Sequence, residues 1–107
     1  MKIVTFNVNG VRARMDTLVE WLKSTCPDVV ALQEIKIQDA DFPISAFETL
    51  GYNCYLHGQK SFNGVAILTK GEATLSSKIL PGNCDDQQAR FLEVYYRKAR
   101  FICIYLP

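Results

Sequence analysis

The sequence is poor in the residues from which zinc sites and disulfide frameworks are built. It contains one histidine and four cysteines, and no two cysteines form a Cys-x-x-Cys pair. Structural zinc sites need closely spaced cysteine and histidine ligands, so zinc binding is disfavoured. The even cysteine count permits disulfides, but no secretory signal places the chain in an oxidising compartment. We therefore expect free, buried thiols.

Two further absences narrow the class of protein. No apolar run approaches the roughly 18 residues of a membrane span, which predicts a cytoplasmic protein without a membrane partner. The chain also lacks a charge surplus, because 12 basic and 11 acidic residues give a formal net charge of +1. Proteins that coat nucleic acid non-specifically usually carry a basic surplus, so that function is disfavoured. An enzyme with a few well-placed cations is not excluded.

What the sequence does contain is the pattern of one α/β domain. Its 107 residues are 49% hydrophobic and 21% charged, and no linker or repeat divides them. Helical spacing from Met15 to Leu22 predicts a helix ending at Cys26, and a second helix is expected at 43–50 with Gly51 as its stop. Six segments have the composition of strands: 2–8, 28–32, 53–56, 65–69, 90–96 and 101–106. This order predicts a mixed sheet with helices on one face.

Three polar residues lie at or near the ends of the expected strands. Asn7 closes the first strand, Glu34 follows the second, and Tyr105 lies near the end of the last. Adjacent strands would bring such ends together at one rim of the sheet, where open α/β folds tend to build their sites. Each residue also has a structural alternative. Asn7 can satisfy the hydrogen bonds of a turn, Glu34 can solvate a loop, and Tyr105 can be an interfacial tyrosine of a hairpin.

Four short sequence words surround these residues. They are Phe-Asn-Val-Asn-Gly-Val-Arg-Ala at 6–13, Leu-Gln-Glu-Ile-Lys at 32–36, Asn-Gly-Val-Ala-Ile-Leu at 63–68 and Ile-Tyr-Leu-Pro at 104–107. In order and spacing the words resemble the exonuclease III/abasic-site endonuclease family of the endonuclease/exonuclease/phosphatase superfamily. The resemblance covers essentially the whole chain, and the word His-Gly-Gln-Lys at 57–60 resembles the bacterial branch.

The resemblance implies a magnesium-dependent catalytic site. Glu34 corresponds to the metal-binding carboxylate, with Asn7 beside it in the same metal site. Tyr105 corresponds to an active-site tyrosine whose hydroxyl can hydrogen-bond or protonate a phosphate oxygen. Mg²⁺, with Mn²⁺ as a substitute, needs few protein ligands because it keeps several waters and takes up phosphate oxygen. Glu34, Asn7 and Tyr105 are therefore the implied catalytic residues.

The resemblance also implies a DNA-binding surface that includes three cations. Arg12, Lys36 and Arg90 match residues that face the DNA backbone or the phosphate network. For Arg12 and Lys36 the alternative is a solvated loop charge. For Arg90 the alternative is a local ion pair with Asp85 or Asp86, just upstream.

A polar loop completes the implied DNA-binding surface. Residues 61–64 match a loop that enters the minor groove, where many family members place a tyrosine. Phe62 keeps the stacking wedge but lacks the hydroxyl, and Asn63 is the other implied nucleic-acid contact in this loop. His57 is interpreted as a structural histidine at a strand end, because the family's catalytic histidine lies much later in the chain.

The family domain is a four-layer α/β sandwich that is longer than this sequence. Residues 1–107 are therefore expected to form an incomplete, N-terminal portion, with the second sheet layer missing. The uncovered sheet face, with residues such as Phe91, Val94 and Ile104, would lie in water. That predicts self-association or association with the missing C-terminal portion. The Gly-Asp-x-Asn and Ser-Asp-His words of the family are absent, so the chain is expected to be inactive alone.

Three functions remain as hypotheses. The leading one is a Mg²⁺-dependent DNA phosphodiester hydrolase of base-excision repair, acting on double-stranded DNA with abasic sites or on 3′ ends. The enzymatic alternative is a lipid or phosphoinositide phosphodiesterase of the same superfamily, which the words at 6–13 and 32–36 disfavour. The third hypothesis is a non-catalytic remnant that only binds DNA or a partner chain.

Overall fold

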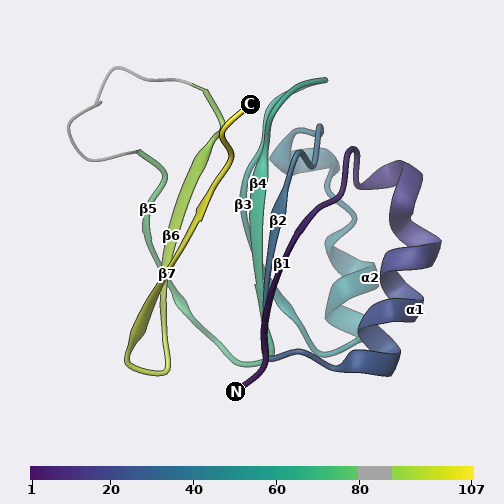
Figure 1. Ribbon diagram of the computed structural model, residues 1–107, viewed down its shortest axis with the longest axis vertical. Helices are drawn as coiled ribbons and strands as arrows, with labels where there is room; N and C mark the ends of the chain where they lie inside the picture. The colour runs from purple at the N-terminus through teal and green to yellow at the C-terminus, as the bar shows by residue number, and fades with distance from the viewer. Residues whose placement is uncertain (80–87) are drawn as a thin grey trace.

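The computed structural model describes residues 1–79 and 88–107, which form three layers. A helical layer covers one face of a four-stranded sheet, and a three-stranded sheet covers the other face (Figure 1). The helical elements are α1 (Met15–Thr25), α2 (Ile44–Thr49) and two 3-10 turns, η1 (Arg12–Arg14) and η2 (Asp39–Asp41). Neither of the described helices is long and apolar enough to cross a membrane.

The four-stranded sheet is mixed, as predicted. Its order is β1-β2-β4-β3, with β1 at Ile3–Asn7, β2 at Val29–Gln33, β3 at Asn53–His57 and β4 at Val65–Thr69. β1 and β2 are parallel, whereas β4 is antiparallel to both β2 and β3. These strands and both α-helices closely match the predicted segments, so the α/β class with helices on one face of a mixed sheet is confirmed.

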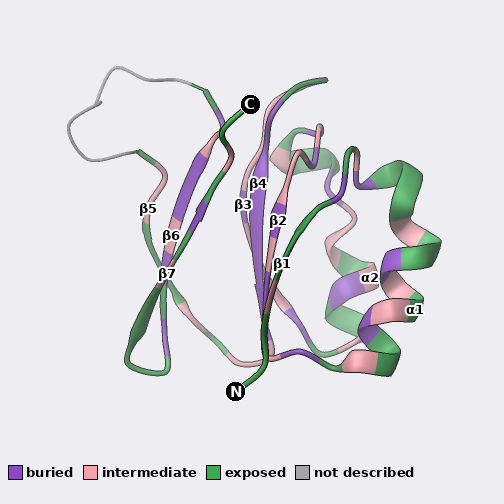
Figure 2. Cartoon of the chain, viewed as in Figure 1, coloured by how far each residue is buried: buried purple, intermediate pink, exposed green. Residues whose placement is uncertain are grey.

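The central strands contribute to two cores at once. The core between the helices and the sheet includes Leu18, Leu22, Val30, Leu32, Phe47 and Leu68. The core between the two sheets consists of Val29, Val65, Ile67, Leu92, Val94, Tyr96 and Cys103. Because successive strand residues point to opposite faces, β2 and β4 supply alternate residues to each core. Figure 2 accordingly shows β4 buried along its whole length.

The structure corrects the expectation that the second sheet layer is missing. β5 (Thr74–Ser77), β6 (Phe91–Tyr96) and β7 (Ala99–Ile104) form a separate antiparallel sheet over the face that was expected to be bare. Phe91 and Val94 are consequently buried, and Ile104 alone of the three named residues is exposed. The physical reason is the amphipathic character of β6, whose Leu92, Val94 and Tyr96 pack against the first sheet. The strand β5 was not predicted.

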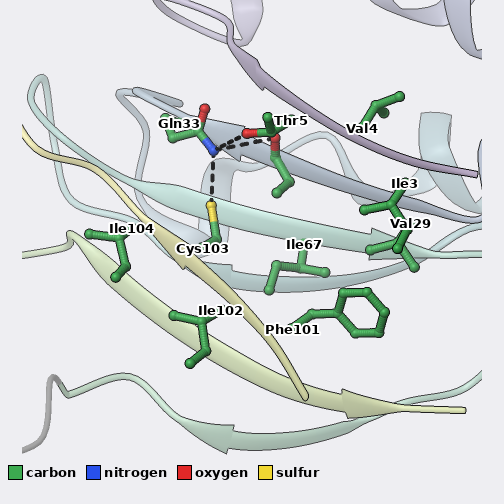
Figure 3. Close-up of a pocket in the computed structure, with 11 residues that line it drawn as sticks. Ile3, Val4, Thr5, Val29, Gln33, Ile67, Phe101, Ile102, Cys103 and Ile104 are labelled. Carbon is green, nitrogen blue, oxygen red and sulfur yellow. Dashed lines mark hydrogen bonds between the residues drawn. The ribbon is translucent and has the colours of Figure 1, made fainter. Parts of the chain in front are cut away.

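The sandwich is open along one side, where β1 and β7 are both edge strands. Among the described strands, β1 pairs only with β2, and β7 pairs only with β6. A hollow of about 430 Å³ lies between them, in which Gln33 Nε2 donates to Thr5 Oγ1 at 2.8 Å and lies 3.2 Å from Cys103 Sγ (Figure 3). Ile3 and Phe6 of β1 are 54% and 44% exposed. Exposed apolar surface therefore exists at this open side, and Tyr95, Ile102 and Ile104 of the second sheet are exposed as well.

The cysteines within the described ranges are free thiols. Cys103 is buried and Cys54 is partly buried, and desolvation raises the pKa of Cys54 to about 12 and that of Cys103 to about 11. Thiols with such pKa values stay protonated at neutral pH and are poor nucleophiles. Cys26 differs from the expectation because it is exposed. Cys84 lies outside the described residues.

Candidate active site at the rim of the sheets

Three loops meet at the rim where β1 and β2 end and β4 begins, at the top of the view in Figure 1. The Gly10 N–H donates to the Glu34 carbonyl at 2.8 Å, and the Ile35 N–H donates to the Gly64 carbonyl at 3.2 Å. Gly64 has a φ of +94°, and a Cβ there would lie 2.5 Å from the Ile35 side chain. Only glycine permits that approach. The segment after β2 is therefore fixed on both sides by backbone hydrogen bonds.

Glu34 is the central side chain of the rim. Its φ of +56° is uncommon for a residue other than glycine, and such backbone strain often marks functional sites. Glu34 Oε1 accepts a hydrogen bond from Asn7 Nδ2 at 2.8 Å, and Oε2 lies 3.6 Å from Lys36 Nζ. The Asn7 hydrogen bond, the Lys36 charge and a hydrogen bond from Tyr105 lower the pKa of Glu34. The carboxylate is therefore ionised at neutral pH.

Asn7 and Lys36 are themselves held in place by Asn9. Asn7 Oδ1 accepts the Asn9 N–H at 3.0 Å, while Lys36 Nζ donates to Asn9 Oδ1 at 2.7 Å. Asn7 thus presents its amide nitrogen to Glu34, and its amide oxygen keeps a second lone pair that could face a cation. The geometry gives Asn7 a role in orienting Glu34. Direct metal ligation by Asn7 stays a prediction.

Tyr105 reaches the same rim from the second sheet. Its backbone N–H donates to the Arg90 carbonyl at 2.9 Å, which fixes the chain just after β7. Desolvation, together with the negative charge of Glu34 and their hydrogen bond, raises the pKa of Tyr105, and the charge of Arg90 opposes this shift. The phenol is therefore protonated and can donate a hydrogen bond. The structure brings Asn7, Glu34 and Tyr105 together, as their positions at strand ends had indicated.

The donor set at the rim fits magnesium better than zinc. Within residues 1–79 and 88–107, no group of three or more His, Cys, Asp or Glu side chains could hold a metal ion. Structural zinc sites require about four nitrogen or sulfur ligands. Mg²⁺, in contrast, takes one or two carboxylates and keeps several waters. The Glu34 carboxylate, with an amide oxygen nearby, is an adequate protein contribution to such a site.

The loop after β3 presents Phe62 to solvent beside this rim. The Phe62 side chain is 69% exposed. Ser61 and Asn63, on either side of it, have φ values of +70° and +53°, so the backbone turns sharply before and after the ring. An apolar ring that is held outward by a constrained loop suits a wedge that inserts between base steps.

Asn63 differs from its expected place as an exposed nucleic-acid contact. Its side chain is buried, and Nδ2 donates to Gln59 Oε1 at 3.0 Å and to Gln88 Oε1 at 2.9 Å. Asn63 Oδ1 accepts from Arg90 Nε at 3.4 Å. Gln59 Oε1 also accepts the Ala89 N–H at 2.7 Å. Asn63 and Gln59 thus orient the loop and Arg90. The sequence did not indicate this role for Gln59.

The remaining sequence-predicted residues occupy different environments. Arg12 is exposed in η1, and its side chain forms no hydrogen bond or ion pair with any described residue. The ion pair suggested for Arg90 involves residues 85–86, which lie outside the described ranges. His57 ends β3 with its Nδ1 at 3.1 Å from the Phe91 carbonyl, a contact between the two sheets. This contact agrees with the structural interpretation of His57.

Comparisons with known proteins place this geometry in a family. The model of the Endonuclease/Exonuclease/phosphatase family matches residues 4–105, which is nearly the whole chain. The chain belongs to this family. It is 44% identical to exodeoxyribonuclease III of Haemophilus influenzae over 92 residues, which cover 86% of this chain and 34% of that protein. Over this region the chain is thus similar to the relative named exodeoxyribonuclease III.

Solved structures of the family show the same fold. An AP endonuclease from Archaeoglobus fulgidus, 34% identical, superposes with a TM-score of 0.92 over 100% of this chain and 41% of that one. The 3′-5′ exonuclease NExo from Neisseria meningitidis, 35% identical, gives a TM-score of 0.93 over 98% of this chain and 41% of that one. The chain thus spans well under half the length of these relatives.

The pKa of Glu34 provides a test of the family-type rim. Asn7→Ala should raise this pKa toward the ordinary value of 4.5, because the largest cause of the lowering is the Asn7 hydrogen bond. A lowered pKa stabilises the fold fully above the ordinary value, and this contribution is lost as the pH falls through the lower, folded value. In the variant the stabilising contribution of Glu34 should be smaller, and what remains of it should be lost at a higher pH than in the unmodified chain. A carboxyl NMR titration measures the shift, with Asn53→Ala as the control, and an unchanged Glu34 pKa would exclude the positioning role of Asn7.

Proposed function

We propose that this chain supplies metal- and DNA-binding parts of a Mg²⁺-dependent DNA phosphodiester hydrolase of base-excision repair. The substrates would be double-stranded DNA with abasic sites or with 3′ ends. The observation that carries the proposal is the ionised Glu34 carboxylate, held by Asn7 with Tyr105 beside it. Relatives named as exodeoxyribonuclease III, AP endonuclease and 3′-5′ exonuclease support a DNA substrate over a lipid substrate.

Each rim residue has a defined part in this chemistry. Glu34 would hold Mg²⁺, with Mn²⁺ as a substitute, and Asn7 would orient Glu34 and contribute its amide oxygen. The bound ion would supply a Lewis acid that offsets charge developing on the scissile phosphate. The Tyr105 hydroxyl would donate a hydrogen bond or a proton to a phosphate oxygen. Lys36, held at 2.7 Å from Asn9 Oδ1, would place an ammonium group beside the same phosphate.

The DNA would be held by residues that flank the rim. Arg12 and Arg90 would neutralise backbone phosphates, which contributes sequence-independent affinity. Phe62 would insert into the minor groove, and the buried Asn63 would keep its loop in shape. The proposal includes a cytoplasmic location, and association of the open β1–β7 side with a second copy or a further segment.

We also propose that residues 1–107 do not cleave DNA efficiently on their own. Hydrolysis needs a general base that activates water. Glu34 is the carboxylate that Asn7 and Lys36 hold at the rim, and His57 is engaged with the Phe91 carbonyl. A carboxylate that binds the metal is not also free to accept the proton.

The test is to incubate the 107-residue chain with a fluorescent abasic-site duplex and Mg²⁺. The proposal predicts binding, measured by fluorescence anisotropy, with little nicking above the background of the duplex alone. Absence of binding, or hydrolysis of phosphoinositide vesicles instead, would contradict a DNA-directed function. Efficient nicking would support the hydrolase assignment but overturn the proposal that these residues are insufficient.

A further inference from the structure

The edge strand β1 lacks the features that usually keep an edge strand single. Four of its five residues are exposed and Val4 is half-buried, as the colouring of β1 in Figure 2 shows. Edge strands are commonly protected by charged side chains, by proline or by bulges, which block pairing with another strand. The five residues of β1 include no charge and no proline, and their register with β2 is regular. The strand is therefore competent to pair with a further strand.

Alternate residues of β1 direct their backbone groups to the open side. Among the described strands only β2 pairs with β1, and the Val8 N–H donates to the Gln33 carbonyl at 3.0 Å. In a parallel pair, alternate residues of a strand bond to the same neighbour, so the even-numbered residues of β1 face β2. The residues whose N–H and C=O groups are left for another strand are Ile3, Thr5 and Asn7.

An apolar pocket flanks β1 on the side of the helices. Its volume is about 340 Å³, and it is lined by Val4, Thr5, Phe6, Thr17, Leu18 and Trp21. The ring centroid of Phe6 lies 6.3 Å from that of Trp21, so an aromatic side chain already forms part of the wall. The hollow between the two sheets flanks β1 on its other side. A strand added to β1 would therefore meet an apolar surface on both of its faces.

A second copy of β1 fits these features when the two strands pair antiparallel across a two-fold axis at Thr5. This register pairs all five residues of β1 and joins the outward backbone groups of Ile3 to those of the second copy's Asn7. It also places the second copy's Phe6 opposite Val4, in a pair without backbone hydrogen bonds, where side chains lie closest. Because Val4 lines the apolar pocket, the Phe6 of each copy would cover the pocket of the other.

The open side is large enough for a stable dimer. In the view down the shortest axis the layers lie side by side, and the strands of each sheet lie behind one another (Figure 1). The side that carries β1 and β7 thus spans the two longer dimensions of the molecule, which are 39 and 33 Å. Such a face exceeds the roughly 800 Å² that each partner of a stable interface buries. The formal net charge of +1 adds little repulsion between copies.

We propose that two copies of this chain associate through antiparallel β1 strands, with the Phe6 of each copy in the apolar pocket of the other. The inference rests on the association proposed above for the open side, and it names the partner, the strand and the register. The four-stranded sheet then continues from one copy into the next. The two-fold axis places the two rims at opposite ends of the joined sheet, so both rims remain accessible.

Sedimentation velocity of the 107-residue chain at micromolar concentration tests the association. The expected species has twice the 12.1 kDa of one chain. Phe6→Lys and Ile3→Lys each place a charge at the joined edge and should raise the Kd of the dimer at least about tenfold. The matched control is Leu75→Lys on β5, because Leu75 is 45% exposed and Phe6 is 44% exposed. This control should remain dimeric.

Two results would overturn the dimer. One is an unmodified chain that stays monomeric, and the other is a dimer that survives both lysine substitutions in β1. Circular dichroism verifies that each variant is folded. If Phe6→Lys does not fold, Ile3→Lys decides the test, because Ile3 is 54% exposed and its replacement disturbs the chain's own core less.

A disulfide cross-link tests the register. Directly opposed residues of a hydrogen-bonded antiparallel pair have Cα atoms about 5.5 Å apart, which a disulfide can span. Thr5→Cys, in a Cys26→Ser background that removes an exposed thiol, should give a covalent dimer when it is oxidised by diamide. Thr74→Cys on β5, in the same background, is the control and should give none. Equal cross-linking of both variants, or of neither, would overturn the register.

Further measurements separate this inference from the DNA-directed function. Glu34→Gln should remain dimeric, because the Glu34 side chain lies at the rim and not at the joined edge. A monomer that binds Mn²⁺ and the abasic-site duplex would refute the dimer alone and would assign the open side to another occupant, such as a further segment of a longer chain. A dimer that binds neither would refute the DNA-directed function and leave the association standing.

Discussion

Replacing Leu92 by alanine should lower the free energy of unfolding by about 2–5 kcal/mol. Leu92 lies on β6 with no exposed surface and packs in the core between the two sheets with Val65 and Ile67. Truncation removes buried apolar surface and leaves a cavity that rigid strands on both sides cannot fill. Urea unfolding followed by circular dichroism measures the change.

The matched control for this prediction is Leu75→Ala in the same sheet. Leu75 lies on β5 and is 45% exposed, so its truncation should cost about 1 kcal/mol or less. If Leu92→Ala does not fold, Leu92→Met keeps the volume and should cost less than about 1.5 kcal/mol. Equal effects of the alanine substitutions at 92 and 75 would mean that the two sheets do not pack as a core.

The second large effect concerns metal binding at the rim. Glu34→Gln should abolish specific binding of a divalent cation, because glutamine keeps the size and shape of the side chain but removes its charge and replaces one acceptor oxygen by an amide NH2. Glu34 is the carboxylate that Asn7, Lys36 and Tyr105 all contact. Mg²⁺ and Mn²⁺ are hard cations that require anionic oxygen, so a neutral amide at this position should bind them far more weakly. The control is Glu72→Gln, which changes an exposed carboxylate after β4 in the same way.

The strands of the first sheet and the helices that cover it could be predicted because their signals are local. The continuous apolar runs at 29–33 and 65–69 reflect strands that are buried on both faces. The end of α1 could be read from Cys26-Pro27, and Cys26 indeed takes the left-handed cap conformation. Convergence of strand ends at the rim then follows from parallel β1 and β2.

The strands β6 and β7 were predicted, at 90–96 and 101–106, whereas β5 and the separation of these strands into a second sheet could not be read from local signals. The strand β5, Thr74–Ser77, is short and mostly exposed, so its sequence has little apolar pattern. The alternation along β6, in which Glu93 and Tyr95 are less buried than Leu92 and Val94, shows that one face packs and the other does not. Which surface it packs against is decided by pairing with β5 and β7 and by the shape of the first sheet. These are non-local choices.

The site shows the same division between local and non-local information. Asn7, Glu34 and Tyr105 could be predicted because each lies at or just beyond a strand end within a recognisable word. The role of Gln59 could not, because its partners include Ala89, 30 positions later in the chain. The burial of Asn63 depends on the same contacts.

The central claim is that the rim of the two sheets binds a divalent cation through Glu34. The most direct test adds Mn²⁺ to the isotopically labelled 107-residue chain and maps the paramagnetic broadening of its NMR signals. We predict that broadening is centred on Asn7, Glu34 and Tyr105, persists in Glu72→Gln and disappears in Glu34→Gln. Broadening that is absent from the rim, is centred on other carboxylates such as Asp28, or persists unchanged in Glu34→Gln would contradict the claim.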